Sequence, residues 1–227
     1  MTDSSPHMNV EVRARQSEGS SGDAIYQMVA RCLQQHRATG MLLDVGCGTG
    51  KLWRFVNDDF DAYVGADLLR YRDFPPDGHF IPVDLDHQHI ALADGAADVV
   101  TAVETIEHVE NPRAFFRELA RLLRPGGWLV ITTPNQLSLL SKLTLLLKNQ
   151  FNAFQDSDYP AHLTALLEID LKRMAAECGL EKIQIDYSGQ GRLVLTSRHY
   201  PPGLSRRWPR AFSDNVLLMG RKPDCTN

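Results

Sequence analysis

The chain has 227 residues, 43% hydrophobic and 23% charged, which predicts one soluble globular domain and excludes a collagen-like or largely disordered protein. Its formal net charge of −4 gives no field that would attract nucleic acid or an anionic membrane non-specifically, and no apolar run reaches the roughly 18 residues of a transmembrane segment. The four cysteines have no C-x-x-C spacing, which excludes a zinc knot or disulfide framework, so we expect a cytoplasmic protein with reduced thiols.

The N-terminal part of the chain divides into a polar stretch and a helix. Residues 1–22 are predicted to be a flexible segment, either frayed or ordered as a lid when a ligand binds, and residues 23–227 are predicted to form a single domain. From Asp23 onward, apolar residues recur at intervals of three and four, which indicates an amphipathic helix. Ser21 or Asp23 is the expected cap, and Gly40 the expected end.

A glycine-rich turn follows. The apolar run 41–45 precedes Gly46, Gly48 and Gly50, and a helix-compatible segment begins at Lys51. This order predicts a strand, a tight turn that lies against a ligand, and a helix N-terminus with unpaired N–H groups. The spacing G-x-G-x-G differs from the dinucleotide fingerprint G-x-G-x-x-G, because Lys51 stands where the third glycine is needed.

Two acidic residues narrow the choice of ligand. Asp44 precedes Gly46 by two positions, where it disfavours a diphosphate and suits a ligand with an ammonium and a sulfonium group. Asp67, next to Leu68, ends the second strand 21 residues after Gly46, the spacing at which a carboxylate accepts hydrogen bonds from ribose hydroxyls. S-adenosylmethionine is the expected cofactor, with Asp44, Asp67 and Leu68 in its site; the alternative is a glycine turn that only joins a strand to a helix.

Three further strands and a helix complete the first part of the sheet. Residues 79–83 predict a strand that ends near the cofactor base, where Asp84 accepts from an exocyclic amine and Leu85 forms an apolar wall, unless Asp84 only caps its loop. The β-branched run 97–103 predicts a central strand. A helix from Pro112, stopped by residues 124–127, then leads into a fifth strand.

Together these motifs resemble the class I S-adenosylmethionine-dependent methyltransferases, in the small-molecule branch called type 11, similar to the quinone-pathway O-methyltransferases. The resemblance covers residues 24–135 and rests on residues 44–50, Asp67, 83–85, 104–112, 123–127 and 132–135. It implies an α/β fold: a doubly wound, mostly parallel seven-stranded sheet with helices on both faces and an antiparallel last strand, in three α/β/α layers.

The resemblance also implies where the cofactor lies and that S-adenosylhomocysteine is the product. It places Gly46, Cys47 and Gly48 against the methionine part, Asp67 on the ribose, Asp84 and Leu85 at the adenine, and Glu104 and Thr105 beside the sulfonium.

The motif Glu104-x-x-Glu107-His108 has two interpretations. Two carboxylates and an imidazole on one turn can bind a divalent metal, and small-RNA 2′-O-methyltransferases use such a set with a distant histidine, for which His162 is the candidate. We expect no metal, because the chain lacks the basic surplus of an RNA-binding enzyme. His108 is instead the first candidate for a general base, unless it only bonds a backbone carbonyl.

The rest of the chain has three features. The leucine-rich stretch 137–154 predicts a substrate cap within an insertion at about 136–165, with a dimer face, an interfacial helix or plain core packing as alternatives. His162, on the loop that follows, is the second candidate base. Residues 181–187 and 215–220 predict an antiparallel strand pair, and the five arginines between them either hold an anion or lie on a solvated loop.

The sequence therefore predicts an enzyme that transfers a methyl group from S-adenosylmethionine to an oxygen, with a nitrogen as second choice, of a small, partly apolar molecule. A homodimer is left open, and no nucleic-acid partner is expected. The alternatives are a metal-dependent RNA 2′-O-methyltransferase and a non-catalytic subunit that binds S-adenosylmethionine.

Overall fold

The computed structural model describes residues 19–194, 196 and 198–224. Of the flexible segment predicted for residues 1–22, residues 1–18 lie outside the described part of the chain. The strands are β1 (Met41–Val45), β2 (Ala62–Asp67), β3 (His79–Pro82), β4 (Ala97–Val103), β5 (Leu123–Pro134), β6 (Glu181–Tyr187) and β7 (Asn215–Arg221). The helices are α2 (Asp23–Gln35), α3 (Trp53–Val56), α4 (Pro112–Leu122), α5 (Leu139–Lys148), α6 (Glu168–Glu177) and α7 (Pro202–Arg207), with a 3₁₀ turn η1 (Asn57–Asp59) after α3.

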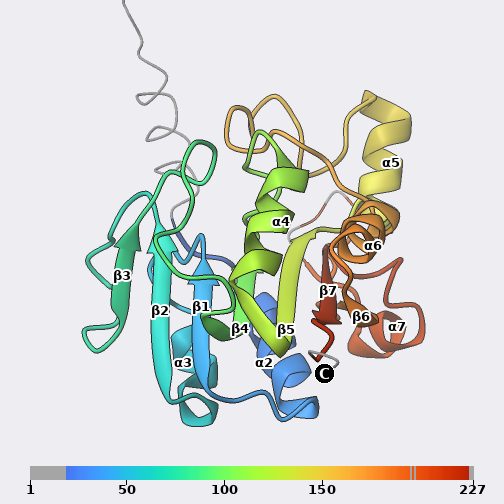
Figure 1. The fold of residues 1–227 in the computed structure, drawn as a ribbon. Helices are drawn as coiled ribbons and strands as arrows, with labels where there is room; N and C mark the ends of the chain where they lie inside the picture. Colours follow the sequence, from blue (N-terminus) through green and yellow to red (C-terminus); the bar gives the residue numbers. More distant parts are fainter. Residues whose placement is uncertain (1–18, 195, 197, 225–227) are drawn as a thin grey trace, which may run out of the picture.

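The strands form one seven-stranded sheet in the order β3-β2-β1-β4-β5-β7-β6 (Figure 1). Strands β1 to β5 pair in parallel, whereas β7 runs antiparallel to both β5 and β6. The structure confirms the predicted doubly wound sheet and its antiparallel last strand. Because the parallel strands point the same way, the residues that follow β1, β2 and β4 meet at one edge.

Helices cover both faces of the sheet, as predicted. Successive residues of a strand point to opposite faces, so Leu42 packs in a cluster with α2 and α3, and Leu43 packs in a second cluster with α4 and α6. Figure 1 shows α4 and α6 on the near face and α2 and α3 behind. The two apolar clusters hold the strand ends in a fixed relation.

The first helix is shorter than predicted. It ends at Gln35 and not at Gly40, because the Ala38 N–H bonds back to the Leu33 carbonyl at 3.1 Å and Arg37 takes a positive φ of 51°. Gly40 instead allows β1 to approach β4, since a Cβ there would lie 2.4 Å from the Asp98 carboxyl group.

Two other local predictions are wrong. The N-cap of α2 is Gly22, with no side-chain cap from Ser21 or Asp23; Asp23 pairs with Lys51 at 2.7 Å instead. Helix α4 ends at Leu122, before the predicted stop at 124–127, because Leu123 already pairs with Ala97 in the sheet.

The remaining C-terminal features are placed as follows. The segment between β6 and β7 contains the short helix α7, which the sequence analysis did not predict. Cys32, Cys47 and Cys178 are free thiols, and Cys225 lies outside the described residues. In the described part of the chain, no helix has both the length and the apolar character that crossing a membrane requires.

The core layer under α4 can be tested by truncation. Phe116 is completely buried between α4 and the sheet, so Phe116→Ala leaves a cavity and is expected to lower the free energy of unfolding by about 3–5 kcal/mol in urea denaturation. Leu147→Ala removes a side chain that is 78% exposed and is expected to change it by less than about 0.5 kcal/mol. An equal decrease in the free energy of unfolding of the two variants would contradict this assignment of the core.

Candidate functional site

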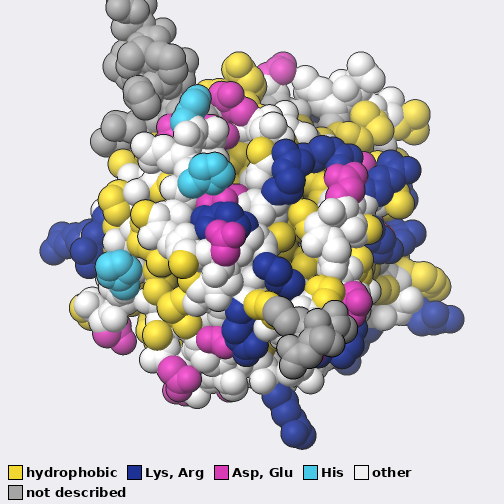
Figure 2. Space-filling model, in the orientation of Figure 1, with side chains coloured by type: hydrophobic (Ala, Val, Ile, Leu, Met, Phe, Trp, Pro, Cys, Tyr) yellow, Lys and Arg dark blue, Asp and Glu magenta, His cyan; other side chains and the backbone are white. Residues whose placement is uncertain are grey.

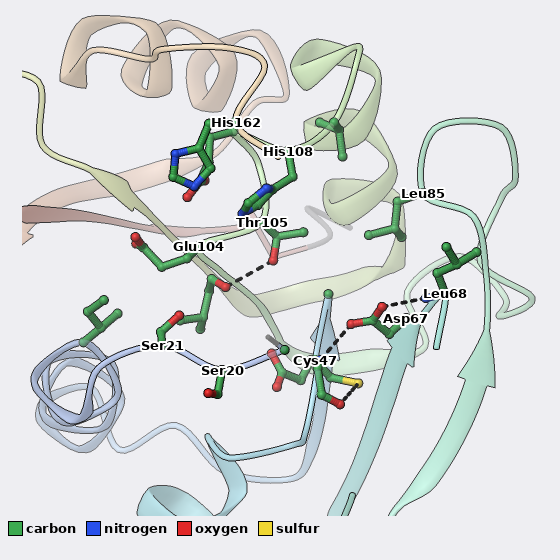
Figure 3. Close-up of a pocket in the computed structure, with 18 of the residues that line it drawn as sticks. Ser20, Ser21, Cys47, Asp67, Leu68, Leu85, Glu104, Thr105, His108 and His162 are labelled. Carbon is green, nitrogen blue, oxygen red and sulfur yellow. Dashed lines mark hydrogen bonds between the residues drawn. The ribbon is translucent and has the colours of Figure 1, made fainter. Parts of the chain in front are cut away.

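A cavity of about 330 Å³ lies at the carboxyl ends of β1, β2 and β4 (Figure 3). Residues from the predicted site come together there, although they are scattered through the sequence. All twelve line the cavity: Asp44, Gly46, Cys47, Gly48, Asp67, Leu68, Asp84, Leu85, Glu104, Thr105, His108 and His162. Their roles toward a ligand stay predictions, and the contacts described below determine what each can do.

The glycine turn after β1 is packed too tightly for side chains. Gly46 has a φ of +71°, and a Cβ on it would lie 2.3 Å from the Thr105 hydroxyl oxygen. Gly48 has a φ of +52°, and a Cβ there would lie 2.0 Å from the Gly19 carbonyl oxygen. Both the backbone angle and the lack of space therefore require glycine at these positions.

The backbone donors of this turn are used within the protein. Every N–H group from residue 46 to residue 50 donates internally: Gly46 and Cys47 bond the Ala66 carbonyl at 2.7 and 3.3 Å, and Thr49 bonds the Gly19 carbonyl at 2.8 Å. A nest of free donors for phosphate is absent from these five residues, which fits a ligand without a diphosphate. Unpaired N–H groups were predicted for the helix N-terminus beyond the turn; the Trp53, Arg54 and Phe55 N–H groups there also bond carbonyls, those of Gly50, Lys51 and Leu52.

Asp67 connects the glycine turn to the end of β2. Its carboxylate accepts hydrogen bonds from the Gly48 N–H at 2.7 Å and from the Leu68 N–H at 2.6 Å, one on each oxygen, as Figure 3 shows. The Leu69 N–H also donates to this carboxylate, and the acceptor capacity that remains can bind a hydroxyl group. Burial raises the pKa of Asp67 above its ordinary value. The geometry fits the predicted role on a ribose.

Asp44 is a buried acid at the end of β1. It is only 2% exposed and accepts hydrogen bonds from the Tyr63 hydroxyl at 2.9 Å and the Thr101 hydroxyl at 2.8 Å. Burial raises the pKa of Asp44 to about 6, against the lowering effect of those two bonds. A cation beside this carboxyl group would favour its ionised form.

Asp84 and Leu85 form the wall beyond β3. The Asp84 carboxylate accepts from the Asp86 N–H at 3.0 Å and lies 3.2 Å from His87 Nδ1. It therefore organises its own loop, the alternative raised from the sequence, and at the same time lines the cavity beside Leu85.

Glu104 is held by the neighbouring strands. Its φ is +50°, its N–H donates to the Thr132 hydroxyl at 2.9 Å, and its carboxylate accepts from Thr132 at 2.8 Å and from the Asn215 amide at 2.7 Å. Burial, together with the nearby Glu107 carboxyl group, raises the pKa of Glu104 well above its ordinary value. Strands β5 and β7 thus fix one carboxyl group at the edge of the cavity.

His108 and His162 lie at the end of the cavity away from Cys47 and Asp67 (Figure 3). His108 Nδ1 bonds the Ala161 carbonyl at 2.8 Å, and His162 Nδ1 bonds the Ala153 carbonyl. Because a carbonyl only accepts, Nδ1 carries the proton in each ring and Nε2 has the basic lone pair. The ring centroids are 4.7 Å apart. Burial lowers the pKa of His162.

The Glu107 side chain lies close to these two histidines. It is fully buried, and its backbone carbonyl accepts from the Leu163 and Thr164 N–H groups at 2.9 and 3.1 Å, which fastens the loop that carries His162. One carboxylate oxygen accepts from the Thr133 hydroxyl at 3.1 Å, whereas Oε1 has no hydrogen-bond partner among the described residues. Burial raises the pKa of Glu107 to about 8.

This cluster can accept a proton or hold a cation. One ligand atom from each of Glu107, His108 and His162 lies within 4.8 Å of the others, and imidazole with carboxylate suits a divalent transition metal. An Nδ1–H bonded to a carbonyl is also how proteins orient metal-binding histidines. Glu104, the fourth member of the metal set considered from the sequence, is outside this group.

The sequence analysis missed the cavity wall near the N-terminus. Residues 19–22 and Tyr26 line the cavity; the Ser21 N–H bonds the Tyr26 hydroxyl at 2.9 Å, and Lys51 Nζ bonds the Ser21 carbonyl at 3.2 Å. No composition change separates residues 19–22 from the polar stretch before them. The available signal was Tyr26, an aromatic residue in the first turn of a helix.

Comparison with known proteins gives consistent results. Residues 20–185 match the model of a methyltransferase domain family. The chain is 27% identical over 199 residues to a "Probable S-adenosylmethionine-dependent methyltransferase" of Mycolicibacterium smegmatis, covering 85% of this chain and 71% of that protein. It is 30% identical over 193 residues to a ubiquinone biosynthesis O-methyltransferase of Psychrobacter arcticus, covering 80% and 71%.

Solved structures show the same fold at low identity. A SAM-dependent methyltransferase from Archaeoglobus fulgidus has a TM-score of 0.59 and 16% identity, covering 87% of this chain and 94% of that one. The [4+2]-cyclase SpnF has a TM-score of 0.57 and 20% identity, covering 87% and 81%.

Because the pKa of Asp44 is raised, we expect cofactor affinity to depend on pH. An acid whose pKa is raised to about 6 is protonated below that pH and ionised above it. The affinity for the cationic S-adenosylmethionine is therefore expected to rise roughly tenfold between about pH 5 and pH 7. A fluorescence titration at each pH measures it. Asp44→Asn should bind more weakly at neutral pH and lose most of the slope, whereas the exposed Asp58→Asn should keep both. A wild-type affinity that is flat over this range would contradict the role of Asp44.

Proposed function

Because this chain belongs to the S-adenosylmethionine-dependent methyltransferases, we propose that it transfers the sulfonium methyl group to an oxygen of a small, partly apolar acceptor. One observation carries the proposal: the cavity that contains the carboxylate-flanked glycine turn also contains two histidines whose Nε2 atoms are basic. The family consists of enzymes, which favours catalysis over a non-catalytic subunit. A nitrogen acceptor is the second form of the same reaction.

The residues on the sheet edge support a cofactor orientation. Asp67, whose carboxylate accepts from three backbone N–H groups and keeps further acceptor capacity, is proposed to accept from the ribose hydroxyls. Asp44 is proposed to face the ammonium and sulfonium charges across the glycine turn, and Asp84 and Leu85 the adenine. In this orientation the methyl group points toward Glu104, Thr105 and the histidine end of the cavity.

Methyl transfer needs little covalent help from the protein. The acceptor oxygen attacks the methyl carbon in line with the C–S bond; that bond breaks, its electron pair stays on sulfur, and S-adenosylhomocysteine is formed. The hydroxyl proton passes to Nε2 of His108, the proposed general base. His162, whose lowered pKa keeps it neutral at neutral pH, is the second candidate. Holding donor and acceptor in contact and excluding water provide most of the remaining rate enhancement.

The acceptor class rests on two observations. The relative from Psychrobacter arcticus is named a ubiquinone biosynthesis O-methyltransferase, which supports an oxygen acceptor. Val83, Leu85, Val103 and Val109 also line the cavity, which supports an acceptor with apolar character. The fold alone does not decide the reaction, because a cyclase has the same fold.

A second candidate function uses a metal ion. The cluster of Glu107, His108 and His162 includes a buried Glu107 oxygen that has no hydrogen-bond partner within the described part of the chain. This arrangement favours a divalent ion that would bind the acceptor oxygen and lower its pKa. The RNA 2′-O-methyltransferase considered from the sequence would use such a site, but the net charge of −4 gives RNA no general attraction.

Substitution of His108 tests the proposed base. His108→Ala is expected to lower kcat by roughly 10²–10⁴-fold, measured as S-adenosylhomocysteine formation with phenol and catechol acceptors that carry apolar tails. Its affinity for S-adenosylmethionine should stay at the wild-type value. The control His89→Ala, whose ring is 88% exposed against Glu118, should keep full turnover. A His108→Ala enzyme that turns over at the wild-type rate would remove this residue from the role.

Metal removal separates the two candidate functions. If His108 acts as a base, dialysis of the purified protein against EDTA should leave methyl transfer unchanged, because no step passes through a metal. Elemental analysis of the same sample should show less than one bound transition metal per chain. Activity that is lost on chelation and restored by Mg²⁺, Mn²⁺ or Zn²⁺ would instead establish the second candidate, and a short RNA acceptor would then test the RNA reaction.

A further inference from the structure

Helix α5 exposes the side chains that a surface helix normally buries. Its single buried residue is Ser141, whereas Leu146 and Leu147 are 80% and 78% exposed and Leu139 and Leu145 are 36% and 38% exposed. An amphipathic helix on a globular protein usually turns its apolar stripe toward the core. Leu139, Leu146 and Leu147, called the leucine face below, lie on the side opposite Ser141, whereas Leu145 follows Ser141 by one helical turn and lies on its side.

Polar contacts hold the helix in this orientation. The Ser141 hydroxyl donates to the Gln136 side-chain oxygen at 3.2 Å and accepts from the Asn152 N–H at 3.3 Å. Ser138 caps the helix by accepting from the Ser141 N–H at 3.1 Å. The leucine face is therefore a consequence of a fixed polar attachment on the opposite side.

The surroundings of the leucine face are cationic. Residues 135–155 contain no Asp or Glu, and α5 contains Lys142 and Lys148, neither of which forms an ion pair with a carboxylate among the described residues. A cavity of about 390 Å³ beside α5 is lined by leucines together with Lys148 and Arg192, and by no acidic residue of the described chain. The Arg192 guanidinium pairs with Asp214 at 3.4 Å, so within the part of the chain that the structure describes the charge that remains unpaired here is that of the two lysines. Figure 2 shows hydrophobic and basic side chains together at the end of the molecule where Figure 1 draws α5.

We propose that the leucine face binds the surface of an anionic lipid bilayer. The 10 residues of α5 extend only ~15 Å, half of the ~30 Å hydrocarbon core, so the helix lies in the interface with its leucines among the acyl chains. Lys142 and Lys148 then contact anionic headgroups. A second copy of the chain is a poorer occupant, because a two-fold interface would bring the same cations together.

Vesicle flotation tests this proposal independently of methyl transfer. The full chain is expected to float with vesicles of equal parts phosphatidylcholine and phosphatidylglycerol and to stay unbound with phosphatidylcholine alone. Leu146→Gln/Leu147→Gln should weaken the partition coefficient roughly tenfold or more. Lys142→Gln/Lys148→Gln should weaken it about fivefold for each charge removed.

Two matched controls use α7 and its C-cap residue Trp208, which lie outside α5 in the sequence. Trp208→Gln removes an apolar side chain that is 54% exposed, and Arg206→Gln/Arg207→Gln removes two positive charges; both should bind vesicles like the wild type. Binding of S-adenosylmethionine should be equal in all variants, which shows that each is folded. A wild-type chain that ignores anionic vesicles, or leucine variants that bind as well as the α7 controls, would overturn the proposal. So would a dimer that Leu146→Gln/Leu147→Gln dissociates without any vesicle binding.

Discussion

The site depends on the absence of a side chain at Gly46. At this residue the turn after β1 contacts both neighbouring strands. The Gly46 N–H donates to the Ala66 carbonyl at the end of β2 at 2.7 Å, and a Cβ on Gly46 would lie 2.3 Å from the Thr105 hydroxyl oxygen just after β4. The carboxyl ends of β1, β2 and β4 therefore lie close together around Gly46. Because an acid lies at or next to the end of each strand, Asp44, Asp67 and Glu104 surround one cavity.

Much of the fold and of the cofactor end could be predicted because their signals are local. Apolar runs specify the strands, glycine is forced where the backbone bends sharply, and parallel strands carry their terminal residues to a common edge. Asp44, Asp67 and Asp84 each follow directly from this reasoning, since each lies within two residues of the end of a strand. The sheet then supplies the distances between them.

The remaining features depend on contacts between distant segments, which one sequence does not reveal. His162 is a candidate from the sequence, but its position depends on the bonds from the Leu163 and Thr164 N–H groups to the Glu107 carbonyl, and no residue near position 162 indicates that partner. For α5, periodicity shows which residues share a face, but the polar bonds of Ser141 decide that the leucines point outward. The stop of α2 at Gln35 likewise depends on how the chain must enter β1.

The buried Asp44 has a consequence for the heat of ligand binding. Near pH 6 part of the empty protein holds a proton on this carboxyl group; if the sulfonium ligand binds beside it, as proposed, that proton is released into the solvent. Calorimetry then records the ligand contacts together with the ionisation enthalpy of whichever buffer captures the proton. Two buffers at the same pH will give different apparent enthalpies for the same affinity, and their difference counts the protons released.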